Sequence, residues 1–126
     1  MIENSDVATQ ADLTLQATTT GTIQTISAGG AGAQTAALGG AVSVNDMGRT
    51  LQAEIIGSKS VIVGQDLTLQ ATDTSTIQSL AGNVSGAGKA ALGASVSKNF
   101  IGYVITTGLD QSTVTANNAQ VDATSN

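Results

Sequence analysis

The chain has 126 residues, with one Phe, one Tyr and no Trp, Cys, His or Pro. The lack of Cys excludes disulfides and thiolate metal sites, and the net charge of −5 argues against a nucleic-acid partner and against electrostatic attachment to anionic lipid. A hydrophobic fraction of 40% with only 10% charged residues also argues against disorder. Because large aromatic side chains are so rare, we expect a thin core built from small aliphatic residues.

An internal repeat organises the sequence. Residues 12–48 return at 66–102 after a shift of 54 positions, and 21 of the 37 aligned residues are identical without a gap. A fixed period of this kind is typical of repeat architectures, in which each unit covers the apolar face of the next. A third copy begins near the end of the sequence, so we expect the chain to be a piece of a longer array. The single segment 1–126 divides into units of about 2–55, 56–109 and a partial 110–126.

Alternation of apolar and polar residues predicts β-strands along each repeat. A period of two with β-branched neighbours is the pattern of a half-buried strand. In chain order, the strands are expected at 13–17, 38–42, 51–55, 61–63, 67–71, 92–96 and 105–109. We expect the core to be formed by the apolar rows Leu13, Leu15, Leu38, Val42, Leu67, Leu69, Leu92 and Val96.

A matching Asn and Gly in each repeat predict turns. Gly48 and Gly102 each lie three residues after an asparagine, a spacing that suits a turn with a permissive backbone. We therefore expect turns at Asn45–Gly48 and at Asn99–Gly102. Because Asn45 and Asn99 hold the same place in their repeats, their side chains are also expected to hydrogen-bond across adjacent coils as a ladder.

These features together predict an all-β fold, a parallel β-solenoid built from 54-residue sequence repeats. One repeat divides into three coils of about 18 residues or two of about 27, the usual sizes of solenoid coils. Both divisions stay open, and so do right and left handedness. The exposed ends of such a stack are expected to pair with neighbouring repeats of the same protein, and an isolated segment is expected to self-associate end to end.

The repeat units resemble those of a known class of proteins. The segments DLTLQATDTSTIQSLAGNVSGAGKAALGASVS and STVTANNAQVDATS are similar in style to repeats of large filamentous-haemagglutinin-like adhesins, especially the leukotoxin-type adhesins of fusobacteria. The resemblance rests on a D-L-T-L-x-A-T strand, an Ala/Gly/Ser stretch and a V-S-x-N segment. It implies a secreted or surface-anchored β-helical stalk, extracellular in location, that serves attachment of a bacterial cell to a host or another surface.

A nucleotide site is disfavoured at Gly86–Lys89, although these residues look like part of a phosphate-binding loop. A P-loop requires Gly five positions before the Gly-Lys pair, where Asn83 stands, and Ser or Thr after the Lys, where Ala90 stands. We therefore expect Lys89 to be a solvent-exposed strand residue.

A calcium site is disfavoured at Asp12 and Asp66, which occupy the same place in the two repeats. One acid per repeat cannot supply the six to eight oxygen ligands that calcium takes. We expect turn residues whose carboxylates accept backbone N–H groups. Asp46 is replaced by Phe100 in the second repeat, which argues against a role for that carboxylate.

An enzymatic solenoid would need paired acids, or acids with basic residues, on one face. Acids are sparse here, and the one candidate aromatic platform for a sugar, Tyr103, is replaced by Arg49 in the first repeat. We therefore expect no catalytic, cofactor or metal site and no enzymatic activity.

Two alternatives to a stalk stay open. In the first, exposed rows of Thr, Gln and Asn contact host glycans or proteins directly. In the second, the small-xxx-small spacing within 26–44 and 82–94 forms helices that pack in a membrane. Polar residues such as Gln34 and Lys89 interrupt these segments, so we expect no membrane insertion.

Overall fold

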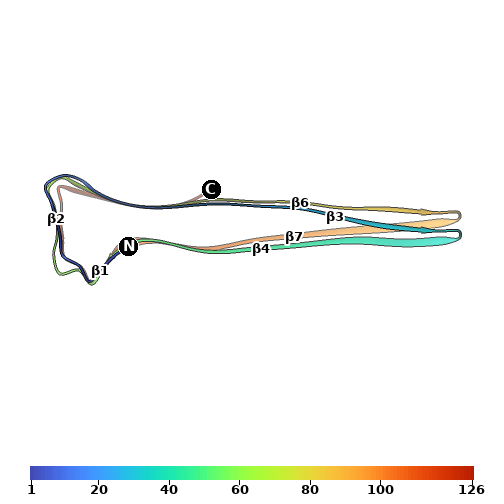
Figure 1. Cartoon of the computed structure of the whole chain (residues 1–126), viewed down its shortest axis with the longest axis horizontal. Helices are drawn as coiled ribbons and strands as arrows, with labels where there is room; N and C mark the ends of the chain where they lie inside the picture. Colours follow the sequence, from blue (N-terminus) through green and yellow to red (C-terminus); the bar gives the residue numbers. More distant parts are fainter. The chain divides into compact units, whose positions relative to one another are not determined.

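The computed structural model describes residues 1–126, and the predicted all-β class is confirmed, since the chain forms nine strands and no helix (Figure 1). Four strands are long: β3 (Leu13–Ala33), β4 (Ala36–Ile56), β6 (Asp66–Ala87) and β7 (Ala90–Asp110). The other five are β1 (Ile2–Glu3), β2 (Val7–Thr9), β5 (Val61–Val63), β8 (Val114–Thr115) and β9 (Asn118–Ser125). No helix is long and apolar enough to span a membrane. The helical alternative for 26–44 and 82–94 is wrong, because both segments lie in strands joined by short turns.

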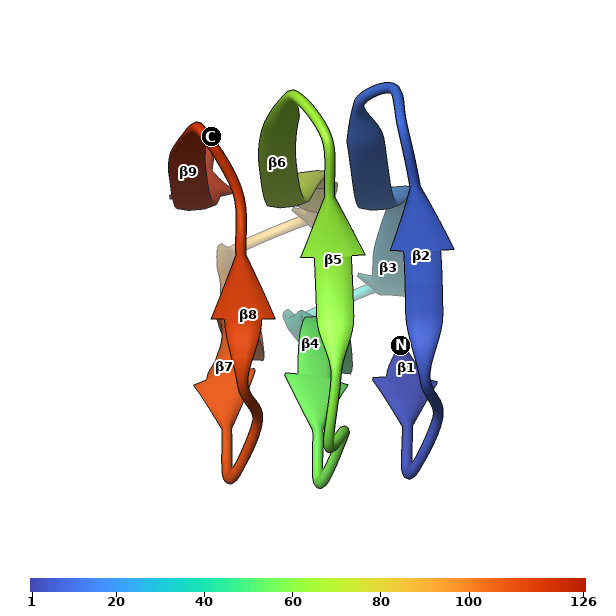
Figure 2. The ribbon, with the colours of Figure 1, turned by 90° about the vertical axis from the view of Figure 1, so that its left-hand side faces the viewer.

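The strands form three parallel sheets of three strands each, in the orders β1-β4-β7, β2-β5-β8 and β3-β6-β9. Figure 2 shows β2, β5 and β8 side by side. Val7 is paired with Val61, and Val61 with Val114, shifts of 54 and 53 residues (61 − 7 and 114 − 61). Each sequence repeat therefore makes one coil of a parallel β-solenoid. The expected coils of about 18 or 27 residues are wrong, because the chain reverses only once within each long pair of strands.

The chain divides into two compact units, each made of several segments. Unit 1 comprises Met1–Thr20, Arg49–Ser75 and Tyr103–Asn126. Unit 2 comprises Gly21–Gly48 and Thr76–Gly102. Each unit combines pieces of successive repeats.

Unit 1 contains the apolar core of the protein. Its buried cluster consists of Ile55, Val61, Val63, Leu67 and Leu69, with Ile2, Val7, Leu13, Leu15 and Val114 packed against it. Leu67 and Leu69 are 0% exposed, whereas Leu13 and Leu15, one coil earlier, are half-buried. Coils lie before and after the strand that carries Leu67, and full burial of such a side chain contributes about 1.5–3 kcal/mol.

Unit 2 buries smaller and more polar side chains than unit 1 does. Its buried residues are Ala37, Ala41, Ser43, Asn45 and Met47. Four residues expected in the core lie outside it, since Leu38 (80%), Val42 (68%), Leu92 (68%) and Val96 (57%) are exposed. This part of the core prediction is wrong.

The narrow interior of unit 2 explains why its leucines and valines point outward. A Cβ added at Gly29 would lie 2.0 Å from the carbonyl oxygen of Gly40, and one added at Gly39 would lie 2.7 Å from Oδ1 of Asn83. Leucine does not fit at such a separation. Because successive side chains of a strand alternate between faces, the small residues take the inner face and the larger ones the outer face.

The predicted turns at Asn45–Gly48 and Asn99–Gly102 are also wrong. These residues lie within β4 and β7, and neither glycine has a positive φ. The chain instead reverses at 34–35 and 88–89, between the long strands. A second corner, after β1, β4 and β7, uses the left-handed region at Asn4 (φ 48°), Gly57 (φ 61°) and Gln111 (φ 45°). Asparagine and glycine tolerate this region more readily than other residues do.

Candidate functional site

A shallow hollow lies on the outer face of β3 and β6 in unit 2. Alternation along each strand places Gln24 and Ile26 on this face of β3, and Gln78 and Leu80 on the same face of β6. These four residues, with Thr25 and Ser79, line a shallow groove of about 340 Å³. Ile26 and Leu80 are exposed, at 81% and 63%. The groove is therefore an open surface feature with an apolar part.

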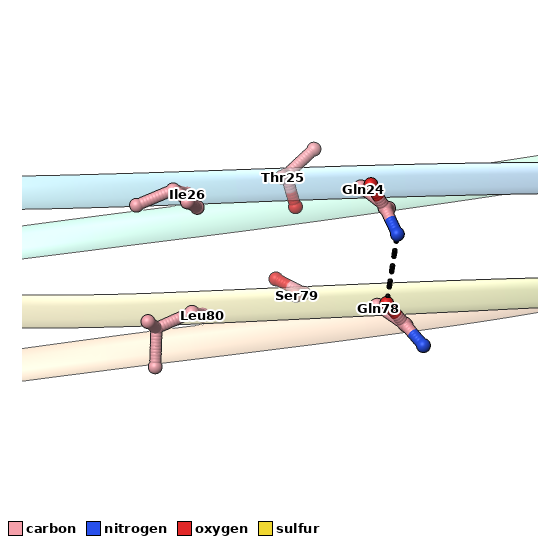
Figure 3. Close-up of a pocket in the computed structure, with 6 residues that line it drawn as sticks. All are labelled: Gln24, Thr25, Ile26, Gln78, Ser79 and Leu80. Atoms are coloured by element: carbon pink, nitrogen blue, oxygen red, sulfur yellow. Dashed lines mark hydrogen bonds between the residues drawn. The ribbon is translucent and has the colours of Figure 1, made fainter.

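An amide pair forms the polar end of this groove. Nε2 of Gln24 donates to Oε1 of Gln78 at 2.9 Å, and Figure 3 shows the Gln24 side chain directed at Gln78. The same figure shows Ile26 and Leu80 further along their strands, on the other side of Thr25 and Ser79. A second pair of this kind, in unit 1, joins Gln16 to Gln70 at 3.1 Å. We call these two pairs, Gln16 with Gln70 and Gln24 with Gln78, the outer Gln rows of units 1 and 2.

The hydroxyl groups next to the groove bond toward the interior of unit 2. Oγ1 of Thr25 lies 3.0 Å from Oγ of Ser43, and the Ser79 hydroxyl donates to that same oxygen at 2.9 Å. The groove lining therefore contains amides and alkyl groups but no acid or base. Such a surface suits packing and hydrogen bonding to a partner.

Asn45 connects the two sheets and the two coils of unit 2. Its Nδ2 donates to Oγ1 of Thr25 at 3.0 Å and to Oδ1 of Asn99 at 2.8 Å. The predicted ladder between Asn45 and Asn99 is confirmed, although both residues lie in strands. We call this hydrogen-bonded group of side chains the polar seam. It consists of Thr25, Ser43, Asn45, Ser79, Ser97 and Asn99. It takes the place that an apolar core has in unit 1.

A second exposed surface covers the outside of β4 and β7 in unit 2. We call it the outer β4/β7 face. Its large apolar side chains are Leu38, Val42, Val44, Leu92, Val96 and Phe100, all exposed. A shallow hollow of about 250 Å³ opens among Leu38, Gly39, Leu92, Gly93 and Ala94. The expected core residues Leu38, Val42, Leu92 and Val96 are thus brought together, but on a surface.

The repeated aspartates bond to the next coil. Oδ1 of Asp12 accepts the backbone N–H of Asp66 at 3.1 Å, and Oδ1 of Asp66 accepts Nδ2 of Asn118 at 2.8 Å. The expectation that a repeated carboxylate accepts a backbone N–H is confirmed for Asp12. The expectation of a turn is wrong for Asp66, which is the first residue of β6 and accepts a side-chain N–H. No group of three or more His, Cys, Asp or Glu side chains lies close enough together to hold a metal ion.

Other residues singled out in the sequence have structural positions. Lys89 is exposed in the turn between β6 and β7, not on a strand as expected. Asp46 and Phe100 are exposed on the outer β4/β7 face. Tyr103 is about half exposed on β7, and Arg49 donates from Nη1 to Oγ1 of Thr19 within unit 1.

The sequence reasoning did not identify Asp73, whose side chain is only 2% exposed. The available signal was its departure from the repeat, since Thr19 occupies the equivalent place one coil earlier. A charged residue that replaces a neutral one in an otherwise matching strand marks an environment that differs between coils.

No family model, curated protein or solved structure matches the chain significantly. The resemblance to filamentous adhesins therefore rests on the sequence motifs alone.

Proposed function

We propose that the chain is a structural repeat segment, a stalk or spacer, of a secreted or surface-anchored bacterial filamentous adhesin. Its role is to present or contribute to attachment to a host or another surface. The observation that supports this most is the equality of the sequence repeat and the coil, seen in the pairing of Val7 with Val61 and of Val61 with Val114. Every coil offers the next one the same backbone ladder, so the architecture can be extended by further repeats.

Side-chain bonds between coils support the same proposal. Gln16 with Gln70, Gln24 with Gln78 and Asn45 with Asn99 each join residues 54 positions apart. The bonds of Asp12 and Asp66 continue from the first coil to the third. These side chains are used to hold successive coils together, and the first partners of the chain are neighbouring repeats.

Adding a repeat tests the structural role. A copy of residues 56–109 inserted after Leu109 continues the periodic sequence, and a scrambled copy of the same residues is the matched control. Because the half-buried side chains of an end coil become covered, we expect the free energy of unfolding in urea to rise by at least about 3 kcal/mol. The scrambled insert should give no rise. Equal stabilities of the original and the extended chain would contradict the proposal.

A second candidate is a direct adhesive surface. The exposed outer Gln rows favour it, because interstrand bonds hold their amides in fixed positions on the outside of the coils. Such rows can offer repeated donors and acceptors to a host glycan or protein. Beads coated with the chain are expected to lose attachment to host cells when Gln16 and Gln70 are both changed to Thr, if the row binds directly. Retained attachment with unchanged unfolding would favour the spacer.

A further inference from the structure

We propose that the outer β4/β7 face of unit 2 binds the same face of a second copy of this chain, so that two chains associate laterally. This contact differs from stacking along the coils, because it uses a sheet face and leaves the strand edges free. It goes beyond a spacer role, since it would join parallel stalks side by side.

The face exposes several large apolar side chains. Six large side chains on one face are more than half exposed, from 56% for Phe100 to 80% for Leu38. At roughly 60–120 Å² for each fully exposed side chain of this type, they present roughly 400 Å² of apolar surface. Patches of about 300–600 Å² are the largest on a typical monomer and are often functional. Pairing two such faces, with the glycines and alanines between, approaches the roughly 1,000 Å² that a specific interface needs.

The shape of the outer β4/β7 face is complementary to the same face of a second copy. Leu38 and Leu92 form one ridge across the two coils, and Val42 and Val96 form the next. Gly40 and Ala94 lie between these ridges, next to the hollow of about 250 Å³. Alternate residues of a strand are roughly 6.7 Å apart, and packed sheets interdigitate at about 10 Å. A ridge of one copy can therefore fill the valley of the other.

The charges on the outer β4/β7 face also favour binding of a second copy of the chain. Asp46 and Lys98 are exposed at outward positions of β4 and β7, one of each sign. Two identical faces therefore meet without net like-charge repulsion. A membrane fits less well: β3 and β7 each have only one neighbouring strand, and unpaired backbone groups at an open sheet edge are not tolerated in hydrocarbon.

Sedimentation velocity on the full chain tests the proposal. We expect a monomer–dimer equilibrium with a dissociation constant on the order of micromolar. The pair Val42→Thr and Val96→Thr keeps β-branched residues on exposed strands, so folding is retained. It should raise the dissociation constant at least tenfold. The matched control, Ile26→Thr with Leu80→Thr on the opposite outer face, should change it by less than twofold. Circular dichroism confirms that each variant keeps its β-structure.

Cross-linking locates the contact, because the chain has no cysteine of its own. With a short bis-maleimide, Val42→Cys should give covalent dimers and Ile26→Cys should not. A chain that stays monomeric at 200 μM would overturn the proposal, as would association that survives Val42→Thr with Val96→Thr, the result expected for end-to-end stacking. Flotation with phosphatidylcholine vesicles that is lost in the same double variant would assign the face to lipid and overturn it as well.

Discussion

Arg49 and Asp73 place opposite charges inside unit 1. The Arg49 guanidinium donates to Thr19, and Thr19 occupies on β3 the place that Asp73 occupies on β6. The nearby bond between Gln16 and Gln70 shows that these strands are aligned at a shift of 54 residues. Adjacent strands lie about 4.8 Å apart, so Thr19, which accepts from Arg49, and Asp73 are neighbours across one strand spacing. Nε of Arg49 and Oδ2 of Asp73 are both buried without a protein hydrogen-bond partner. We infer that each charge offsets part of the desolvation cost of the other.

A double-mutant cycle measures this coupling. Arg49→Met and Asp73→Thr, the latter copying the residue of the preceding coil, should each lower the free energy of unfolding by about 2–4 kcal/mol, because each leaves one buried charge uncompensated. The double variant should cost clearly less than the sum of the two. Urea unfolding gives the three values. The exposed Asp46→Thr is the control and should change stability by less than about 0.5 kcal/mol. Strictly additive costs for Arg49 and Asp73 would show that the two side chains do not interact.

At the scale of the strand, alternation along β4 was readable from the sequence, but the choice of the inner face was not. Leu38 and Val42 share a face by their spacing, and their hydrophobicity suggested the interior. The separation of the sheets in unit 2 decides otherwise, since Gly29 approaches the backbone of Gly40 too closely for a leucine to fit between. That distance depends on a residue from another strand. The pattern in unit 1 was easier to interpret, because Leu67 and Leu69 lie on the inner face of β6 and are both buried in the apolar cluster.

Because of the polar seam, the part of β4 in unit 2 is sensitive to the loss of a hydrogen-bond donor. Nδ2 of Asn45 is the donor in its bonds to Thr25, Ser43 and Asn99. Asn45→Asp keeps the shape but replaces this donor with a buried carboxylate, which cannot donate to Oδ1 of Asn99 or to the two hydroxyl oxygens.

We expect Asn45→Asp to lower the free energy of unfolding by about 2–4 kcal/mol, through lost hydrogen bonds and the burial of a charge. Chemical denaturation checks this. Gln52→Glu adds the same charge at an exposed position of β4 and should cost less than about 0.5 kcal/mol. If both variants have equal stability, the polar seam does not stabilise the sheets.

At the scale of the whole molecule, the period of 54 was evident from the sequence, whereas its division into coils was not. Short solenoid coils need several turns per repeat, and the Asn45–Gly48 and Asn99–Gly102 segments looked like such turns. In the structure these residues continue a strand, because the Asn45 side chain bonds inside unit 2 and Gly48 has no positive φ. A glycine within an alternating pattern can therefore lie in a strand as readily as in a turn, and only the pairing between coils distinguishes the two.

The two units are expected to differ in local stability, because an apolar core stabilises one and a polar seam the other. Burial of Ile55, Leu67 and Leu69 contributes about 1.5–3 kcal/mol per side chain in unit 1, whereas each bond of the seam in unit 2 contributes about 0.5–1.5 kcal/mol net. Regions with few buried apolar contacts open at lower free energy. In hydrogen exchange followed by mass spectrometry, peptides from 21–48 and 76–102 should exchange at least about tenfold faster than those from 49–75. Asn45→Asp should speed exchange within unit 2 and leave 49–75 unchanged. Uniform protection across both units would mean that the chain opens as a single cooperative structure, and that the seam stabilises unit 2 as strongly as the apolar core stabilises unit 1.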